Sequence, residues 1–246
     1  MGNAAMWGAI SGSAVMIGAL FALYLNIPKK IIGWIMAFGT GVLIGAATYE
    51  LLGDSADKSG LPPTIIGFLA GALVFTLFDW YISRKGGAGR KRSDRSAGQD
   101  SQSGVGGMAI FAGTVLDAIP ESIMLGSSLI GGKSVSLLLV IAIFISNIPE
   151  GLSSTAGLKS DGYTKKRIVL LWSSVVLISI VATIGGYVFM EHVSDYTKAI
   201  IASFAGGGII AMVCSSMMPE AYDEGGSITG FVAALGLLCS LILDHM

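Results

Sequence analysis

Charged side chains are scarce in this chain of 246 residues, in which Asp, Glu, Lys and Arg together make up 13%. A soluble domain carries about 25% charged residues, so the chain has roughly half of the usual complement. Hydrophobic residues account for 53% of the sequence, and the mean hydropathy is +0.75. These values argue against a soluble domain and indicate a protein of the lipid bilayer. The net charge of −1 indicates no particular partner, and we expect none among nucleic acids.

Cysteine and histidine are also rare, with two residues of each. Cys214 and Cys239 both fall in apolar stretches, where a cysteine usually serves as a small buried hydrophobe. Two cysteines form neither a disulfide framework nor a zinc-finger motif. His192 and His245 lie outside the apolar centres of the predicted spans, so a metal site inside the membrane would have no imidazole ligand.

Glycine, by contrast, is abundant, with 35 residues or about twice its average share. Small residues in apolar segments allow helix backbones to approach closely in lipid, where burial of apolar surface gives no driving force for association. Examples spaced four residues apart are Gly8 and Gly12, Gly41 and Gly45, and Gly67 and Gly71. The sequence therefore predicts closely packed membrane helices.

Eight apolar stretches are long enough to cross a hydrocarbon core of about 30 Å, which takes roughly 20 helical residues. They are residues 6–25, 31–52, 63–82, 107–130, 134–158, 167–190, 198–219 and 227–244. Most are joined by short polar turns, but residues 83–106 are rich in Gly, Ser, Arg and Lys and predict a flexible loop. The expected fold class is all-α: a polytopic membrane protein with eight transmembrane helices, formed by residues 1–246 as a single transmembrane domain.

The basic residues sort to one side of these spans. Of the 15 Lys and Arg residues, twelve fall in alternate loops on one side and three, Lys58, Lys133 and Lys198, on the other. Positively charged loops remain in the cytoplasm. We therefore expect a multi-pass protein of the cell membrane, with both termini outside and loop 83–106 in the cytoplasm.

Three carboxylates lie near the middle of the fourth and fifth predicted spans: Asp117, Glu121 and Glu150. Each costs about 3 kcal/mol in the bilayer centre, which requires a compensating function. Asp117 and Glu121 share one helix face, and Asn147 shares a face with Glu150. The arrangement is typical of a cation site inside the membrane.

The segments around these acids repeat each other, because Ile-Pro-Glu occurs at residues 119–121 and again at 148–150. Each proline lacks an N–H, so the carbonyl four residues earlier becomes available as a further oxygen ligand. Residues 38–54 also resemble residues 204–220, and these spans should run in opposite directions. The pattern predicts the inverted repeat found in many transporters.

Two other interpretations of the buried acids remain open. They could be protonated and hydrogen-bonded within kinked helices, without any ligand. Asp79 and Asp117 could also form the catalytic pair of an intramembrane aspartyl protease. The Gly-x-Gly-Asp motif of such proteases is missing, since Val115 and Leu116 precede Asp117. We therefore expect no enzyme.

At residues 117–122 and 146–151 the chain resembles the ZIP (Zrt/Irt-like protein) family of divalent-metal transporters, whose members typically read His-Asn-x-Pro-Glu-Gly in the fourth span. The eight spans and the long loop between the third and fourth extend the similarity over nearly the whole chain. The resemblance implies metal ligands at Asp117, Glu121, Ser146, Asn147 and Glu150. It also implies a transporter that often forms a homodimer and works by an elevator-like movement.

The chain departs from this family pattern at three positions: Asp117 replaces the usual histidine, Ala118 the usual asparagine and Ser122 the usual glycine. Alanine cannot bind a metal, which argues against a two-metal form of the site. The remaining ligands are all oxygen atoms, which suit manganese or magnesium, whereas imidazole suits zinc and iron. Zinc also accepts carboxylates, so the expected substrate is a divalent cation, with zinc, manganese, iron and magnesium as candidates.

Two further acids lie along the expected route of the ion. Glu50 ends the second predicted span on the outer side, and Glu220 ends the seventh on the inner side. Each could attract or release cations, or could simply be a solvated helix end. The leading hypothesis is a zinc-type metal carrier. The alternatives are a carrier or channel for a harder cation and a membrane metal-binding protein that does not transport.

Overall fold

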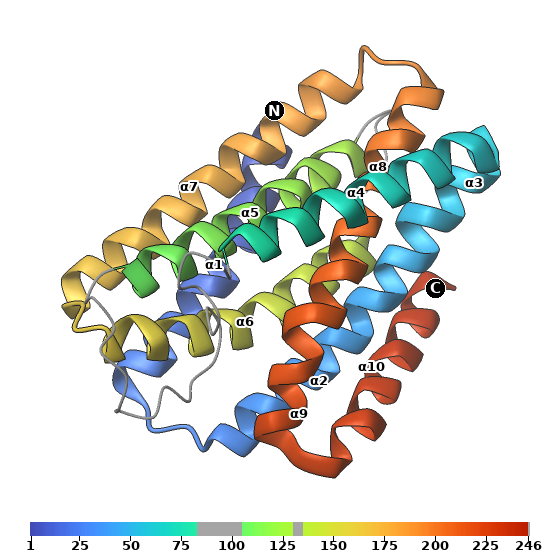
Figure 1. Cartoon of the computed structure of the whole chain (residues 1–246). Helices are drawn as coiled ribbons and strands as arrows, with labels where there is room; N and C mark the ends of the chain where they lie inside the picture. The colour runs from blue at the N-terminus through green and yellow to red at the C-terminus, as the bar shows by residue number, and fades with distance from the viewer. Residues whose placement is uncertain (83–104, 130–134, 246) are drawn as a thin grey trace.

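A computed structural model describes residues 1–82, 105–129 and 135–245, with side chains described from residue 111 onward in the second range. All regular elements in these ranges are helical, which confirms the predicted all-α class (Figure 1). The long helices are α1 Gly2–Tyr24, α2 Lys29–Ala46, α4 Leu61–Ile82, α5 Val105–Ser128, α6 Leu137–Ser160, α7 Lys165–Met190, α8 Asp195–Met212 and α10 Thr229–Asp244.

Shorter helical elements extend α2 and α8. They are the π-helix η1 Ala47–Gly53 and α3 Asp54–Ser59 after α2, and the π-helix η4 Val213–Met217, α9 Met218–Gly225 and the 3₁₀-helix η5 Gly226–Ile228 after α8. Helical structure therefore continues past residues 52 and 219, where the second and seventh predicted spans end.

Six continuous helical stretches among the described residues are long and apolar enough to cross a membrane. One of them, Asp195–Asp244, contains both the seventh and eighth predicted spans. The fourth predicted span corresponds to α5, which is not among the six. The chain is thus a multi-pass membrane protein, and the count of eight spans stays a prediction.

The long helices form two groups. In the first, α1 packs along α6 and α7, and α5 packs along α7; in the second, α4 packs along α8, and α10 along α2. The two groups meet where α2 lies against α6. Figure 1 shows α1, α5, α6 and α7 on one side of the molecule and α2, α8 and α10 on the other.

Glycine permits the closest helix pairs, as the sequence predicted. A Cβ on Gly18 of α1 would collide with the carbonyl oxygen of Ile148 on α6, and a Cβ on Gly151 of α6 would collide with the carbonyl oxygen of Val15 on α1. The other close pairs are reciprocal in the same way, through Gly41 and Gly236 for α2 and α10, Gly71 and Gly207 for α4 and α8, and Gly126 and Gly186 for α5 and α7. Helix backbones in these pairs are in direct contact.

Two features of α2 and α8 support the inverted repeat. The start of α2 lies against the end of α9 at Gly33 and Gly225, and Ser59 at the end of α3 donates to the carbonyl oxygen of Asp195 at the start of α8. The two helices are therefore antiparallel. In the repeat segments 38–54 and 204–220, the change from α- to π-helix falls after the ninth residue of each. Single π-helical turns of this kind often occur at functional sites.

Candidate metal site

The predicted ligands lie on two neighbouring helices, with Asp117 and Glu121 on α5 and Ser146, Asn147 and Glu150 on α6. None of these five side chains is more than 7% exposed. Both helices run through their internal prolines without interruption. The two motifs are polar segments in an otherwise apolar helix pair. A buried carboxylate needs a cation or hydrogen-bond donors around it, so such groups are expected next to both motifs.

A hydrogen bond joins the two motifs. The amide nitrogen Nδ2 of Asn147 donates to Oε2 of Glu121 over 3.5 Å. This distance is at the long limit for a hydrogen bond, so the interaction is weak. The amide therefore places the Glu121 carboxylate beside α6 without binding it tightly.

Asp117 and Glu121 line a cavity of about 170 Å³ between α4, α5 and α8. The other walls are apolar: Gly71, Val74, Phe75 and Phe78 from α4, and Phe204, Ala205, Gly208, Ile209 and Met212 from α8. The cavity has room for a few water molecules or a partly hydrated ion. Carboxylates in an apolar chamber favour a cation, because the surroundings screen their charge poorly.

Ser146 and Glu150 are not part of this cavity wall. The Ser146 hydroxyl donates to the carbonyl oxygen of Ile143 in its own helix, over 3.1 Å. A Cβ on Gly39 of α2 would lie 3.0 Å from the Cα of Ser146, so this part of α6 faces α2. In the described part of the chain, no three His, Cys, Asp or Glu side chains are close enough to hold a metal ion. The structure thus brings Asp117, Glu121 and Asn147 together, and leaves Ser146 and Glu150 apart from the cavity.

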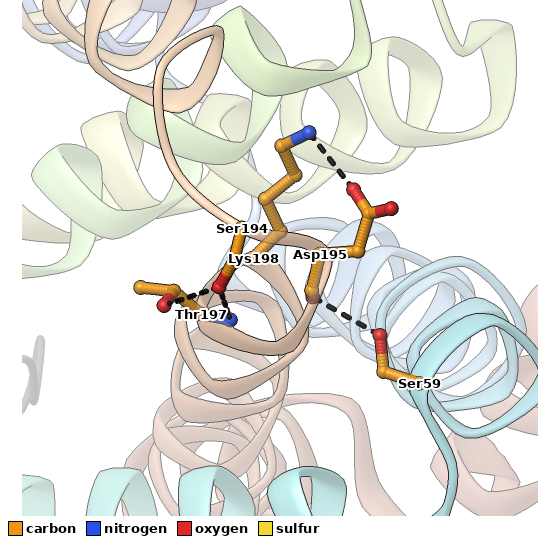
Figure 2. A network of polar contacts seen from close by, with 5 residues as sticks. All are labelled: Ser59, Ser194, Asp195, Thr197 and Lys198. Carbon is orange, nitrogen blue, oxygen red and sulfur yellow. Dashed lines mark hydrogen bonds and ion pairs between the residues drawn. The ribbon is translucent and has the colours of Figure 1, made fainter.

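A second, larger cavity of about 670 Å³ lies at the end of the molecule where η1, α3 and the start of α8 meet. Its wall includes four acids and two lysines: Glu50, Asp54, Asp195, Asp244, Lys58 and Lys198. Lys58 pairs with Asp54, and Lys198 pairs with Asp195 at 3.0 Å, as Figure 2 shows for the second pair. We call this cavity the vestibule; its four acids and two lysines give the wall a formal negative charge, which favours cations over anions.

The two glutamates predicted to lie along the ion's route accept hydrogen bonds from serines at the start of α6 and within it. The Ser136 hydroxyl donates to Oε1 of Glu50 in η1, and the Ser153 hydroxyl donates to Oε1 of Glu220 in α9. Sequence reasoning missed both serines. Ser153 lies three residues after Glu150, on the same face of α6, and this spacing is the signal that could have identified it.

Comparisons with known proteins agree with the motifs. The family model described as ZIP Zinc transporter matches residues 83–246. The Arabidopsis thaliana protein named "Putative zinc transporter At3g08650" is 26% identical over 219 residues, covering 86% of this chain and 33% of that protein. "Zinc transporter SLC39A7" of Canis lupus familiaris is 22% identical over 65% of this chain and 37% of its own length, and the Homo sapiens protein of the same name is 23% identical over 56% and 31%.

The chain spans about a third of the length of these curated relatives. The family match, in contrast, extends over well more than half of the chain and includes both Pro-Glu motifs as well as Glu220. The chain therefore belongs to the ZIP zinc transporter family.

Proposed function

We propose that this protein carries a divalent metal cation across the membrane, and that the ion binds at the two carboxylates of α5, beside α6. The observation that carries the proposal is the cavity lined by Asp117 and Glu121, with Asn147 bonded to Glu121 from the neighbouring helix. Two buried acids and an amide from repeated motifs supply the oxygen ligands that a divalent cation needs. The membership in a family of zinc transporters supports the same reading.

The ligand set of the loaded state is larger in this proposal than the set now on the cavity wall. Glu150 lies one helical turn after Asn147 on α6, and Ser146 directly precedes Asn147. We place Ser146 and Glu150 in the loaded site. In this proposal α6 turns the face that carries them toward α5. Oxygen ligands alone favour manganese or magnesium, while the names of the relatives favour zinc. Zinc is the leading substrate, and a harder cation is the alternative.

The route of the ion follows from the vestibule and the two pathway glutamates. We infer that a cation enters from outside through the vestibule, passes Glu50, reaches Asp117 and Glu121, and leaves past Glu220. The predicted topology, with both termini outside and loop 83–106 in the cytoplasm, sets the direction of this route. Exposed leucines along α4, such as Leu69, Leu73 and Leu77, suit contact with lipid or with a second copy in a homodimer.

The test is cation flux into liposomes that contain the purified protein. We expect zinc or manganese uptake above that of protein-free liposomes, and at least a tenfold loss in Glu121→Gln, because the amide keeps the shape but removes the charge. Glu191→Gln is the matched control, since Glu191 is an exposed acid at the end of α7. Tight zinc binding without any flux would instead favour the metal-binding protein that does not transport.

A further inference from the structure

Helix α6 is attached to the second helix group at its first turn. Ser136 is the N-cap of α6, and its hydroxyl oxygen accepts from the backbone N–H of Leu139 over 3.1 Å. The same hydroxyl donates its proton to the carboxylate of Glu50, which belongs to η1. One side chain therefore caps α6 and also ties it to the continuation of α2.

A second attachment lies near the other end of α6. The Ser153 hydroxyl donates to the carboxylate of Glu220 in α9, and both side chains are buried, at 2% and 4% exposure. Hydrogen bonds from a hydroxyl to a carboxylate are stronger than bonds between neutral groups, especially where water is excluded. This bond therefore ties the inner half of α6 to the continuation of α8.

The two attachments flank the candidate metal motif. At 1.5 Å per residue, Ser136 and Ser153 are separated by about 25 Å along α6, and residues 146–150 lie between them. Both acceptors come from the second helix group. Glu50 lies within the π-helix η1, and Glu220 lies in α9, which directly follows the π-helix η4. A displacement of α6 along the second group that exceeds hydrogen-bond range at both ends would break both bonds.

We propose that Ser136 and Ser153 are positioning residues that hold α6 through Glu50 and Glu220, and that a divalent cation on either carboxylate releases the serine. The proposal rests on the proposed function, because it takes these glutamates as transient binding sites along the route of the ion. Each serine presents its hydroxyl proton to the carboxylate, and a bound cation repels that proton while it binds the same oxygens. Arrival of the substrate thereby loosens the helix that carries the motif Asn147 to Glu150.

Glu50 is placed to meet the ion first, because it lines the vestibule. The serine and the cation then compete for one carboxylate. Loss of the Ser136 hydroxyl should therefore make Glu50 easier for the cation to occupy, and leave the bond from Ser153 to Glu220 as the remaining one of the two side-chain attachments. The expected signature is a lower KM for the cation with little change in kcat, which a general loss of folding would not produce.

The experiment combines hydrogen exchange with flux, in protein reconstituted at full length. Zinc at saturating concentration should increase amide exchange in the first turn of α6, at residues 139–141, in the wild-type protein. Ser136→Gly should show fast exchange there without zinc, since glycine is tolerated at an N-cap but has no hydroxyl to bind Glu50 or the N–H of Leu139. Ser136→Thr should restore the zinc-dependent change. Glu50→Gln should abolish it, because the amide oxygen still accepts from Ser136 but binds zinc weakly.

In flux assays, Ser136→Gly should lower the KM for zinc by at least about tenfold, as expected for loss of a competing hydrogen bond to a charged group. For the inner attachment, Ser153→Ala should speed exchange over residues 150–156, whereas the neighbouring Ser154→Ala, which deletes an equally buried hydroxyl, should not. Zinc flux with no zinc effect on exchange in the wild type, or an unchanged KM in Ser136→Gly, would overturn this inference alone. Absence of any zinc or manganese flux in the wild type would overturn the proposed function.

Discussion

The contact between α6 and α2 and the contact between α5 and α8 are equivalent by the internal repeat, yet the structure makes them differently. Helix α6 packs closely on α2, whereas α5 barely touches α8, and the cavity of about 170 Å³ fills the space between them. The repeat pairs Gly39 with Ala205 and Ser146 with Asp117. Gly39 lies directly against Ser146, while Ala205 and Asp117 are opposite walls of the cavity. One contact is closed and its counterpart is open.

This difference shows where the molecule can change shape. In a protein with inverted repeats, exchange of the two arrangements would close α5 on α8 and open α6 from α2. The acids at the open contact face a cavity, whereas Ser146 at the closed contact bonds its own backbone. In the proposed site, the asymmetry thus separates residues that already face a cavity from residues that would need a movement to reach it.

The largest effect should come from filling the two equivalent positions with the same side chain. Gly39→Leu must push against the backbone of α6, so we expect the free energy of unfolding to fall by about 1–3 kcal/mol and flux to be lost. Ala205→Leu extends into the cavity, so unfolding should stay within about 1 kcal/mol of the wild type while flux falls at least tenfold. Chemical denaturation in detergent and liposome flux measure the two quantities. Equal destabilisation by both variants would contradict the difference between the contacts.

A smaller effect should follow from placing histidine at the same two repeat positions. Asp117→His introduces imidazole into the cavity, and we expect the preference for zinc over manganese to rise roughly tenfold in competition assays. Ser146→His puts the ring against Gly39 in a closed contact, so it should reduce stability without a comparable gain for zinc. An unchanged ratio in Asp117→His would mean that position 117 does not touch the metal.

The grouping of Asp117, Glu121 and Asn147 was predictable from the sequence because it follows helix periodicity. The four-residue spacing of Asp117 and Glu121 places them on one face, and the repeated motif on the next helix brings Asn147 to Glu121. Both results need only adjacent helices of known period. The family resemblance, which rests on the same residues, is confirmed by the match over residues 83–246.

Other features could not be read from the sequence, for physical reasons. The Ser146 hydroxyl has a carbonyl acceptor in its own helix, so its ability to bind a metal depends on the conformation. Serine in a membrane helix usually bonds to its own backbone in this way, which concealed the bonds from Ser136 and Ser153 to the second helix group. The π-helical turns that precede α3 and α9 also shift the helix faces without any change in hydropathy.

The most direct test of the proposed metal site is X-ray absorption spectroscopy of the zinc-loaded protein, compared with Glu121→Ala and Glu150→Ala. We expect one bound zinc whose ligands are all oxygen atoms at about 2.0–2.2 Å, and loss of that ion in both variants. The chain offers two cysteines and two histidines as competing ligands, all outside the motifs on α5 and α6. A zinc–sulfur distance of about 2.3 Å, or the multiple-scattering pattern of imidazole, would place the ion elsewhere and contradict the carboxylate site.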